Sequence, residues 1–149
     1  MQKFKIEHFD KDNPTLEFPN YRSLNNEELI NVQENLISGF NVNTDRDLLR
    51  LVKAIDSLEI DIDDINADDD DFNLQKIFDF IKIKPTEYIY INWYRYDDID
   101  SMMLSDFSNY FHDIWYQGSD DIDIFDETFS WIVSVRHDGA MRYTKNTTS

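Results

Sequence analysis

Apolar residues recur at helical spacing along three segments in the first half of the chain. The first begins at Asn25, with Glu28 three residues later as in a capping box, and Gly39 marks its end. Pro85 limits the third segment, because proline cannot continue a helix. The spacing predicts helices over residues 25–39, 44–58 and 71–82.

The second half of the chain changes to aromatic and β-branched residues. Residues 87–96, EYIYINWYRY, are apolar on both faces, which predicts a strand in the interior of a sheet. Residues 131–135 alternate, and Asp138-Gly139 is a dipeptide favoured at hairpin turns, so residues 140–144 are expected to form the return strand. Residues 104–116 return to helical spacing, whereas residues 4–9 alternate weakly and predict a short first strand.

This order predicts an α+β fold in which N-terminal helices pack on a mostly antiparallel sheet with a C-terminal hairpin. The length of 149 residues suits one domain over 1–149, with a frayed polar tail at 146–149.

Acidic residues dominate the charge of the chain. Asp and Glu number 31 against 14 Lys and Arg, and the net charge is -17. Such a surface does not favour direct binding to nucleic acid or to an anionic membrane, since both require cationic side chains. We therefore expect any macromolecular partner to be a basic protein.

The acids are distributed unevenly. No Lys or Arg lies between Arg95 and Arg136, an interval with ten acidic residues. Within GSDDIDIFDE (118–127), strand alternation would turn Ile122 and Ile124 inward, and Asp121 and Asp123 outward. We predict a partner-binding surface of acids with aromatic anchors: Asp97, Asp98, Asp100, Asp120, Asp121, Asp123 and Asp126, with Tyr96, Tyr116 and Phe125.

Motifs for catalysis or metal binding are missing from the sequence. The chain has no cysteine, Gly-rich phosphate loop or HExxH helix. The acidic run 59–71 does not fit an EF-hand loop, because registers from Asp61 or Asp63 place Asn66 or Asp68 where glycine is required. We predict that this run is a solvated connector that also caps the next helix. No catalytic, cofactor or metal site is predicted, and a carboxylate-dependent or metal-dependent enzyme is the third-ranked interpretation.

The N-terminal residues have no apolar run after their lysines, and no segment approaches the roughly 18 apolar residues of a membrane span. The expected location is therefore the cytoplasm.

Residues 109–141 contain WYQGSDDIDIFD followed by a Trp-containing strand and His-Asp-Gly. This block resembles segments of small acidic bacterial immunity-type proteins from toxin-immunity gene neighbourhoods. The resemblance implies that the chain binds and neutralises a cognate basic toxin or nuclease, without cofactor or catalysis. The alternative is a phage-type DNA mimic that inhibits a restriction or CRISPR nuclease, which would carry its carboxylates in two rows.

Overall fold

The structure is a computed structural model that describes residues 1–43 and 47–146. Its helices are α1 (Lys3–Asp12), α2 (Asn26–Gly39), α3 (Leu48–Leu58), α4 (Leu74–Ile81), α5 (Leu104–Asn109) and α6 (Phe111–Ile114). Its strands are β1 (Tyr21–Ser23), β2 (Ile60–Ile62), β3 (Tyr88–Tyr94), β4 (Asp98–Met103), β5 (Ile122–Asp126), β6 (Trp131–Val135) and β7 (Met141–Lys145).

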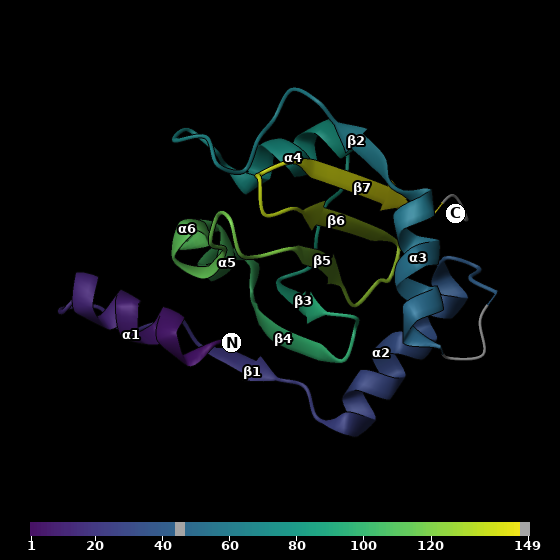
Figure 1. Cartoon of the computed structure of the whole chain (residues 1–149), viewed down its shortest axis with the longest axis horizontal. Helices are drawn as coiled ribbons and strands as arrows, with labels where there is room; N and C mark the ends of the chain where they lie inside the picture. The colour runs from purple at the N-terminus through teal and green to yellow at the C-terminus, as the bar shows by residue number, and fades with distance from the viewer. Residues whose placement is uncertain (44–46, 147–149) are drawn as a thin grey trace.

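The seven strands form one antiparallel sheet in the order β1-β4-β3-β5-β6-β7-β2, and Figure 1 shows them from β2 at the top to β1 at the bottom. The β6–β7 hairpin pairs Val135 with Met141. The α+β class, the hairpin and the interior position of β3 are therefore confirmed.

Helices cover both faces of the sheet. On one face, α4, α5 and α6 pack over a core that contains Ile122, Ile124 and Val133. On the other face, α2 and α3 pack over Phe125 and Ile132. All five residues of β6 are buried, because the sheet is enclosed on both sides. This double cover decides where several acidic side chains lie.

Two local predictions were wrong. Residues 4–9 lie in α1, where Lys5 and Phe9 face the body of the protein at i,i+4 spacing. The acidic run 59–71 was predicted to be a solvated connector, but Ile60–Ile62 pairs with β7 as an edge strand before the exposed part begins. Residues 104–116 form two short helices, α5 and α6, rather than one.

The ends of the helices and of the chain also refine the predictions. Asn25 and Glu28 form the predicted capping box of α2. The expected start of the second helix at Thr44 lies outside the described residues, and Asp47 caps α3 by accepting from Leu49 N at 3.0 Å. Asn146 is held by a bond from its N–H to Ser130 O (2.8 Å), so it is not frayed; residues 147–149 lie outside the described part.

No helix among residues 1–43 and 47–146 is both long and apolar enough to cross a membrane.

Candidate protein-binding surface

The structure separates the ten predicted site residues into interior and surface groups. Asp97, Asp98 and Asp121 are exposed, and Tyr116 is half-buried. Asp123 is half-buried, and five others are buried: Tyr96, Asp100, Asp120, Phe125 and Asp126. The seven acids therefore do not all present their carboxylates to solvent in this conformation.

Asp126 and Asp100 bind internal donors. Asp126 accepts from Thr86 N at 3.0 Å and from the Trp131 indole N–H at 3.1 Å. Asp100 accepts from the Trp93 indole at 2.9 Å and from Ser23 Oγ at 2.6 Å. Because buried polar groups require such partners, these carboxylates stabilise the ends of strands instead of presenting charge.

Asp120 holds a buried lysine. Lys5 Nζ pairs with the Asp120 carboxylate and donates to Ile114 O at 2.6 Å. The same nitrogen lies 4.5 Å from the ring centroid of Trp93 and 4.6 Å from that of Tyr116. Burial lowers the pKa of Lys5, and the hydrogen bond and charge of Asp120 oppose that shift. The pair fixes α1 against the body of the protein.

Asp123 is the clearest correction to the reading of GSDDIDIFDE. Ile122 and Ile124 face the core as expected, but the opposite face is covered by α2 and α3. The Asp123 carboxylate accepts from Asn92 Nδ2 at 2.9 Å and from Ser134 Oγ at 2.5 Å, and burial raises its pKa. Asp121, by contrast, is exposed and accepts from His137 N at 2.7 Å.

The turn between β3 and β4 is tightly constrained. Arg95 and Tyr96 both have positive φ, 50° and 60°, in the left-handed region that side chains rarely adopt. Asn92 Oδ1 accepts from Tyr96 N at 2.8 Å, and Gln33 Nε2 donates to Tyr96 O at 2.8 Å. The buried Tyr96 ring and these two bonds hold the turn in one conformation.

Tyr94 is the aromatic residue that this turn exposes. Its exposed fraction is 56%, and the Arg95 guanidinium carbon lies 4.8 Å from its ring centroid. Strand alternation alone would give Tyr94 and Tyr96 the same environment, but the left-handed turn sends Tyr96 inward. The sequence signal for Tyr94 was its aromatic character beside acids, which does not distinguish it from Tyr96.

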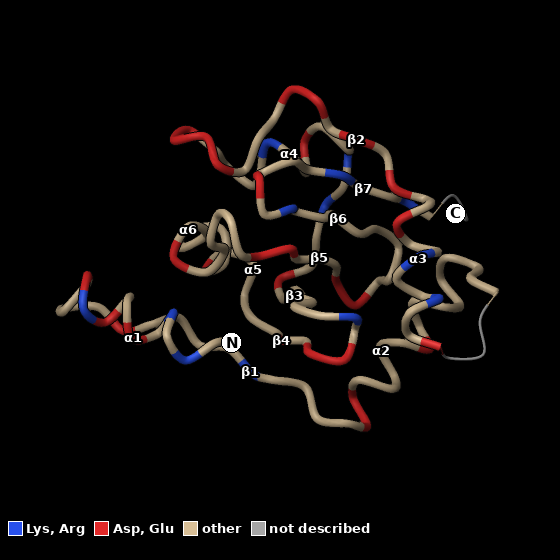
Figure 2. The backbone as a smooth tube through the Cα atoms, in the orientation of Figure 1, with Lys and Arg blue, Asp and Glu red and all other residues tan. Residues whose placement is uncertain are grey.

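A hollow of about 360 Å³ brings surface acids from two segments together. We call it the turn cleft; its walls are Met1, Gln2, Trp93, Tyr94, Asp98, Ser119, Asp120 and Asp121. Its acids come from two stretches that are red in Figure 2, one at the β3–β4 turn and one immediately before β5. Partial burial raises the pKa of Asp98; the Asp100 and Asp97 carboxylates act in the same direction, and the ammonium group of Met1 opposes the shift.

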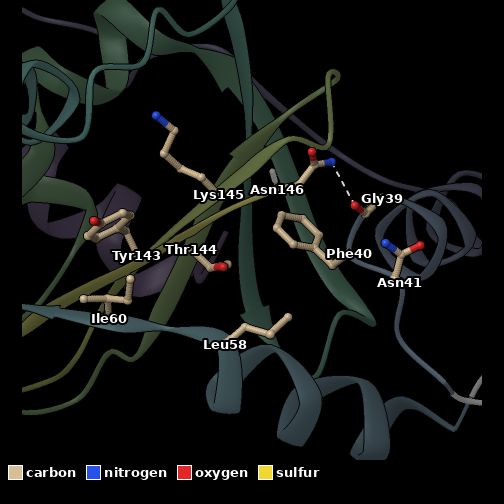
Figure 3. A pocket seen from close by; sticks show the side chains of 9 residues that line it. All are labelled: Gly39, Phe40, Asn41, Leu58, Ile60, Tyr143, Thr144, Lys145 and Asn146. Atoms are coloured by element: carbon tan, nitrogen blue, oxygen red, sulfur yellow. Dashed lines mark hydrogen bonds between the residues drawn. The ribbon is translucent and has the colours of Figure 1, made fainter. Parts of the chain in front are cut away.

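A second hollow, of about 400 Å³, lies between the end of α2, the α3–β2 corner and β7 (Figure 3). Its walls include the exposed apolar side chains of Leu58 and Ile60 and no carboxylate. Lys145 donates to Ile81 O at 2.9 Å, and Asn146 Nδ2 donates to Gly39 O at 2.8 Å, so these two side chains have internal partners.

The three histidines lie in separate places. His112 Nε2 is 2.7 Å from Ala67 O, His8 Nδ1 is 3.3 Å from the Tyr116 hydroxyl, and His137 Nδ1 is 3.0 Å from Asp121. Over the described ranges, no three His, Asp or Glu side chains are arranged to hold a metal ion.

In comparisons with protein-family models, curated proteins and solved structures, nothing matches this chain.

Proposed function

We propose that this protein is an immunity-type inhibitor that binds a basic toxin or nuclease through the turn cleft. The observation that carries the proposal is the meeting of Asp98 and Asp121, 23 positions apart, beside the exposed Tyr94 ring. An aromatic anchor next to desolvated charge is the composition of an interface hot spot.

The charges of the turn cleft favour a cationic occupant. Asp98 makes no salt bridge to a Lys or Arg side chain within the described residues, and Asp121 pairs there with the imidazole of His137. The two ammonium groups nearby are already paired, that of Met1 with Asp100 and that of Lys5 with Asp120. A lysine or arginine from a partner would pair with the exposed carboxylates of Asp98 and Asp121. The net charge of -17 would also accelerate the encounter with a basic protein.

The rigidity of the β3–β4 turn supports binding rather than catalysis. The left-handed residues Arg95 and Tyr96 are held by Asn92 and Gln33, so Tyr94 and Asp98 are positioned before any partner arrives. Preorganised groups lose less conformational entropy on association. Inhibition then follows from steric and electrostatic blocking of the partner, and requires no cofactor.

The product of the adjacent gene is the first partner to test. We expect it to be toxic when expressed alone, to be neutralised by co-expression with this protein, and to co-purify with it less well as salt rises. A restriction or CRISPR nuclease as the partner would instead favour the DNA-mimic alternative. Unchanged binding from 50 to about 500 mM salt would remove the electrostatic part of the proposal.

Single substitutions in the turn cleft test whether the partner binds at this surface. Asp98→Asn and Asp121→Asn should each raise the Kd about tenfold, and Tyr94→Ala by at least as much. Asp64→Asn and Asp69→Asn are matched controls, since both remove an exposed carboxylate from the connector after β2, which does not line the turn cleft. If the control variants raised the Kd as much as Asp98→Asn and Asp121→Asn, then net charge, and not the turn cleft, would determine binding.

A further inference from the structure

Glu59 is a buried carboxyl group at the corner between α3 and β2. Its side chain is 0% exposed, and its Oε1 lies 3.4 Å from Arg136 Nη2. Its Oε2 has no hydrogen-bond partner among the described residues. A buried ionised oxygen without a donor is costly, so the ordinary charged form of glutamate fits this position poorly.

Several elements place charged groups around Glu59. Asp56 comes from α3, Asp61 from β2 and Asp123 from β5, and Asp121 adds its charge near Arg136. The cations are Arg136, which also contacts Asp56 at 3.0 Å, and Arg142 of β7, whose Nε lies 3.0 Å from Asp61. Carboxylates therefore outnumber guanidinium groups in this cluster.

Ser134 links Glu59 to Asp123. The Ser134 hydroxyl donates to Asp123 Oδ1 at 2.5 Å, and its hydrogen bonding to the Glu59 carboxyl group acts to lower the pKa of Glu59. A serine hydroxyl has one hydrogen. Since Asp123 takes that hydrogen, Ser134 cannot fully satisfy an ionised Glu59 at the same time.

We propose that Glu59 is a proton-binding switch: the folded protein favours its uncharged form, and loss of the proton loosens the α3–β2 corner from the sheet. The surrounding network continues from Ser134 to Asp123 and Asn92, and Asn92 also holds the β3–β4 turn. The switch does not depend on the proposed partner.

The titration of Glu59 agrees with this arrangement. Burial raises the pKa of Glu59 from 4.5 to about 7, and the charges of Asp123 and Asp56 act in the same direction, whereas the Ser134 hydrogen bond and the charge of Arg136 oppose the shift. A carboxyl group whose pKa is higher in the folded state contributes stability that is complete below 4.5 and is lost as pH rises through 7. The switch therefore opens on the alkaline side.

Urea unfolding between pH 4.5 and 8.5 tests the proposal. Relative to Glu59→Gln, the wild-type protein should show an unfolding constant that rises on the order of a hundredfold across this window. Glu87→Gln is the matched control, because Glu87 is exposed, and it should follow the wild type. Parallel curves for the wild type and Glu59→Gln would overturn the proposal.

Carboxyl-carbon NMR of the folded wild type tests the proposal without the Glu59→Gln variant, and so remains possible if that variant does not fold. One glutamate should titrate near pH 7, and amide protection, corrected for intrinsic exchange, should fall in α3 and β2 across the same midpoint. Ser134→Ala should raise that midpoint, since it removes a hydrogen bond that favours the charged form of Glu59. Titration of every glutamate below pH 5.5, or unchanged amide protection in α3 and β2 across the midpoint, would contradict the proposed switch.

Discussion

The Lys5 ammonium lies 4.5 Å from the ring centroid of Trp93, buried where α1 meets the sheet. It also pairs with Asp120, so a charged side chain occupies a position that an apolar residue would fill more cheaply. The Lys5–Asp120 pair therefore fixes the position of α1. Asp120 and Trp93, which surround the Lys5 ammonium, also form part of the turn cleft.

Lys5→Met should destabilise the protein by about 3 kcal/mol, because it leaves the Asp120 carboxylate buried without its cation. Lys3→Met is the control, since the Lys3 side chain is 90% exposed, and it should change the free energy of unfolding by no more than about 0.5 kcal/mol. Urea denaturation measures both. Adding Asp120→Asn to Lys5→Met should recover part of the loss; an equal or larger loss would argue against the ion pair.

Two glycines with similar backbone angles should respond differently to alanine. Gly139 has φ +87°, and a Cβ there would lie 2.0 Å from Asn66 Oδ1; Gly118 has φ +84° and open space around it. Gly118→Ala should cost about 1 kcal/mol from backbone strain alone, and Gly139→Ala about 3 kcal/mol or more from strain and clash together. Thermal unfolding of the pair checks the difference, and equal losses would mean that the 59–71 segment yields easily at Asn66.

The strained turn predicts a gain in stability. Arg95→Gly should be about 1 kcal/mol more stable than Arg95→Ala, because both lack the guanidinium group that lies over Tyr94 but only glycine adopts φ 50° without strain. Chemical denaturation of the two variants isolates this backbone effect. Equal free energies of unfolding for Arg95→Ala and Arg95→Gly would show that the backbone at this position is not strained.

Substitutions of Asp126 and Asp121 should affect different properties: stability in the first case and partner binding in the second. Asp126→Asn should cost about 2 kcal/mol, since an amide has one acceptor oxygen and cannot accept all the bonds that the two carboxylate oxygens receive from Thr86, Thr128 and Trp131. Asp121→Asn should leave stability within about 1 kcal/mol because the residue is exposed, while weakening partner binding. Unfolding and binding measurements on the same preparations make the comparison, and a reversed pattern would place Asp126 on the interface.

The local pattern of the chain was sufficient for much of the fold. The Asn25–Glu28 capping box, the apolar stripes of α2 and α3, and the Asp138-Gly139 hairpin are short-range features, so their sequence signals were reliable. The helix Lys3–Asp12 was not predicted from the sequence. Its buried side chains are Lys5 and Phe9, and lysine is rarely a core residue.

The candidate site depended on long-range contacts that no local pattern contains. The sequence alone determined the large excess of acids, the α+β class and the inward alternation of Ile122 and Ile124. Only the tertiary structure decided which acids face solvent, because helices on both faces of the sheet enclose Asp123 while leaving Asp121 exposed. It also brought Asp98 to Asp121 and left one oxygen of Glu59 unpaired, since strand order and packing place groups distant in sequence side by side.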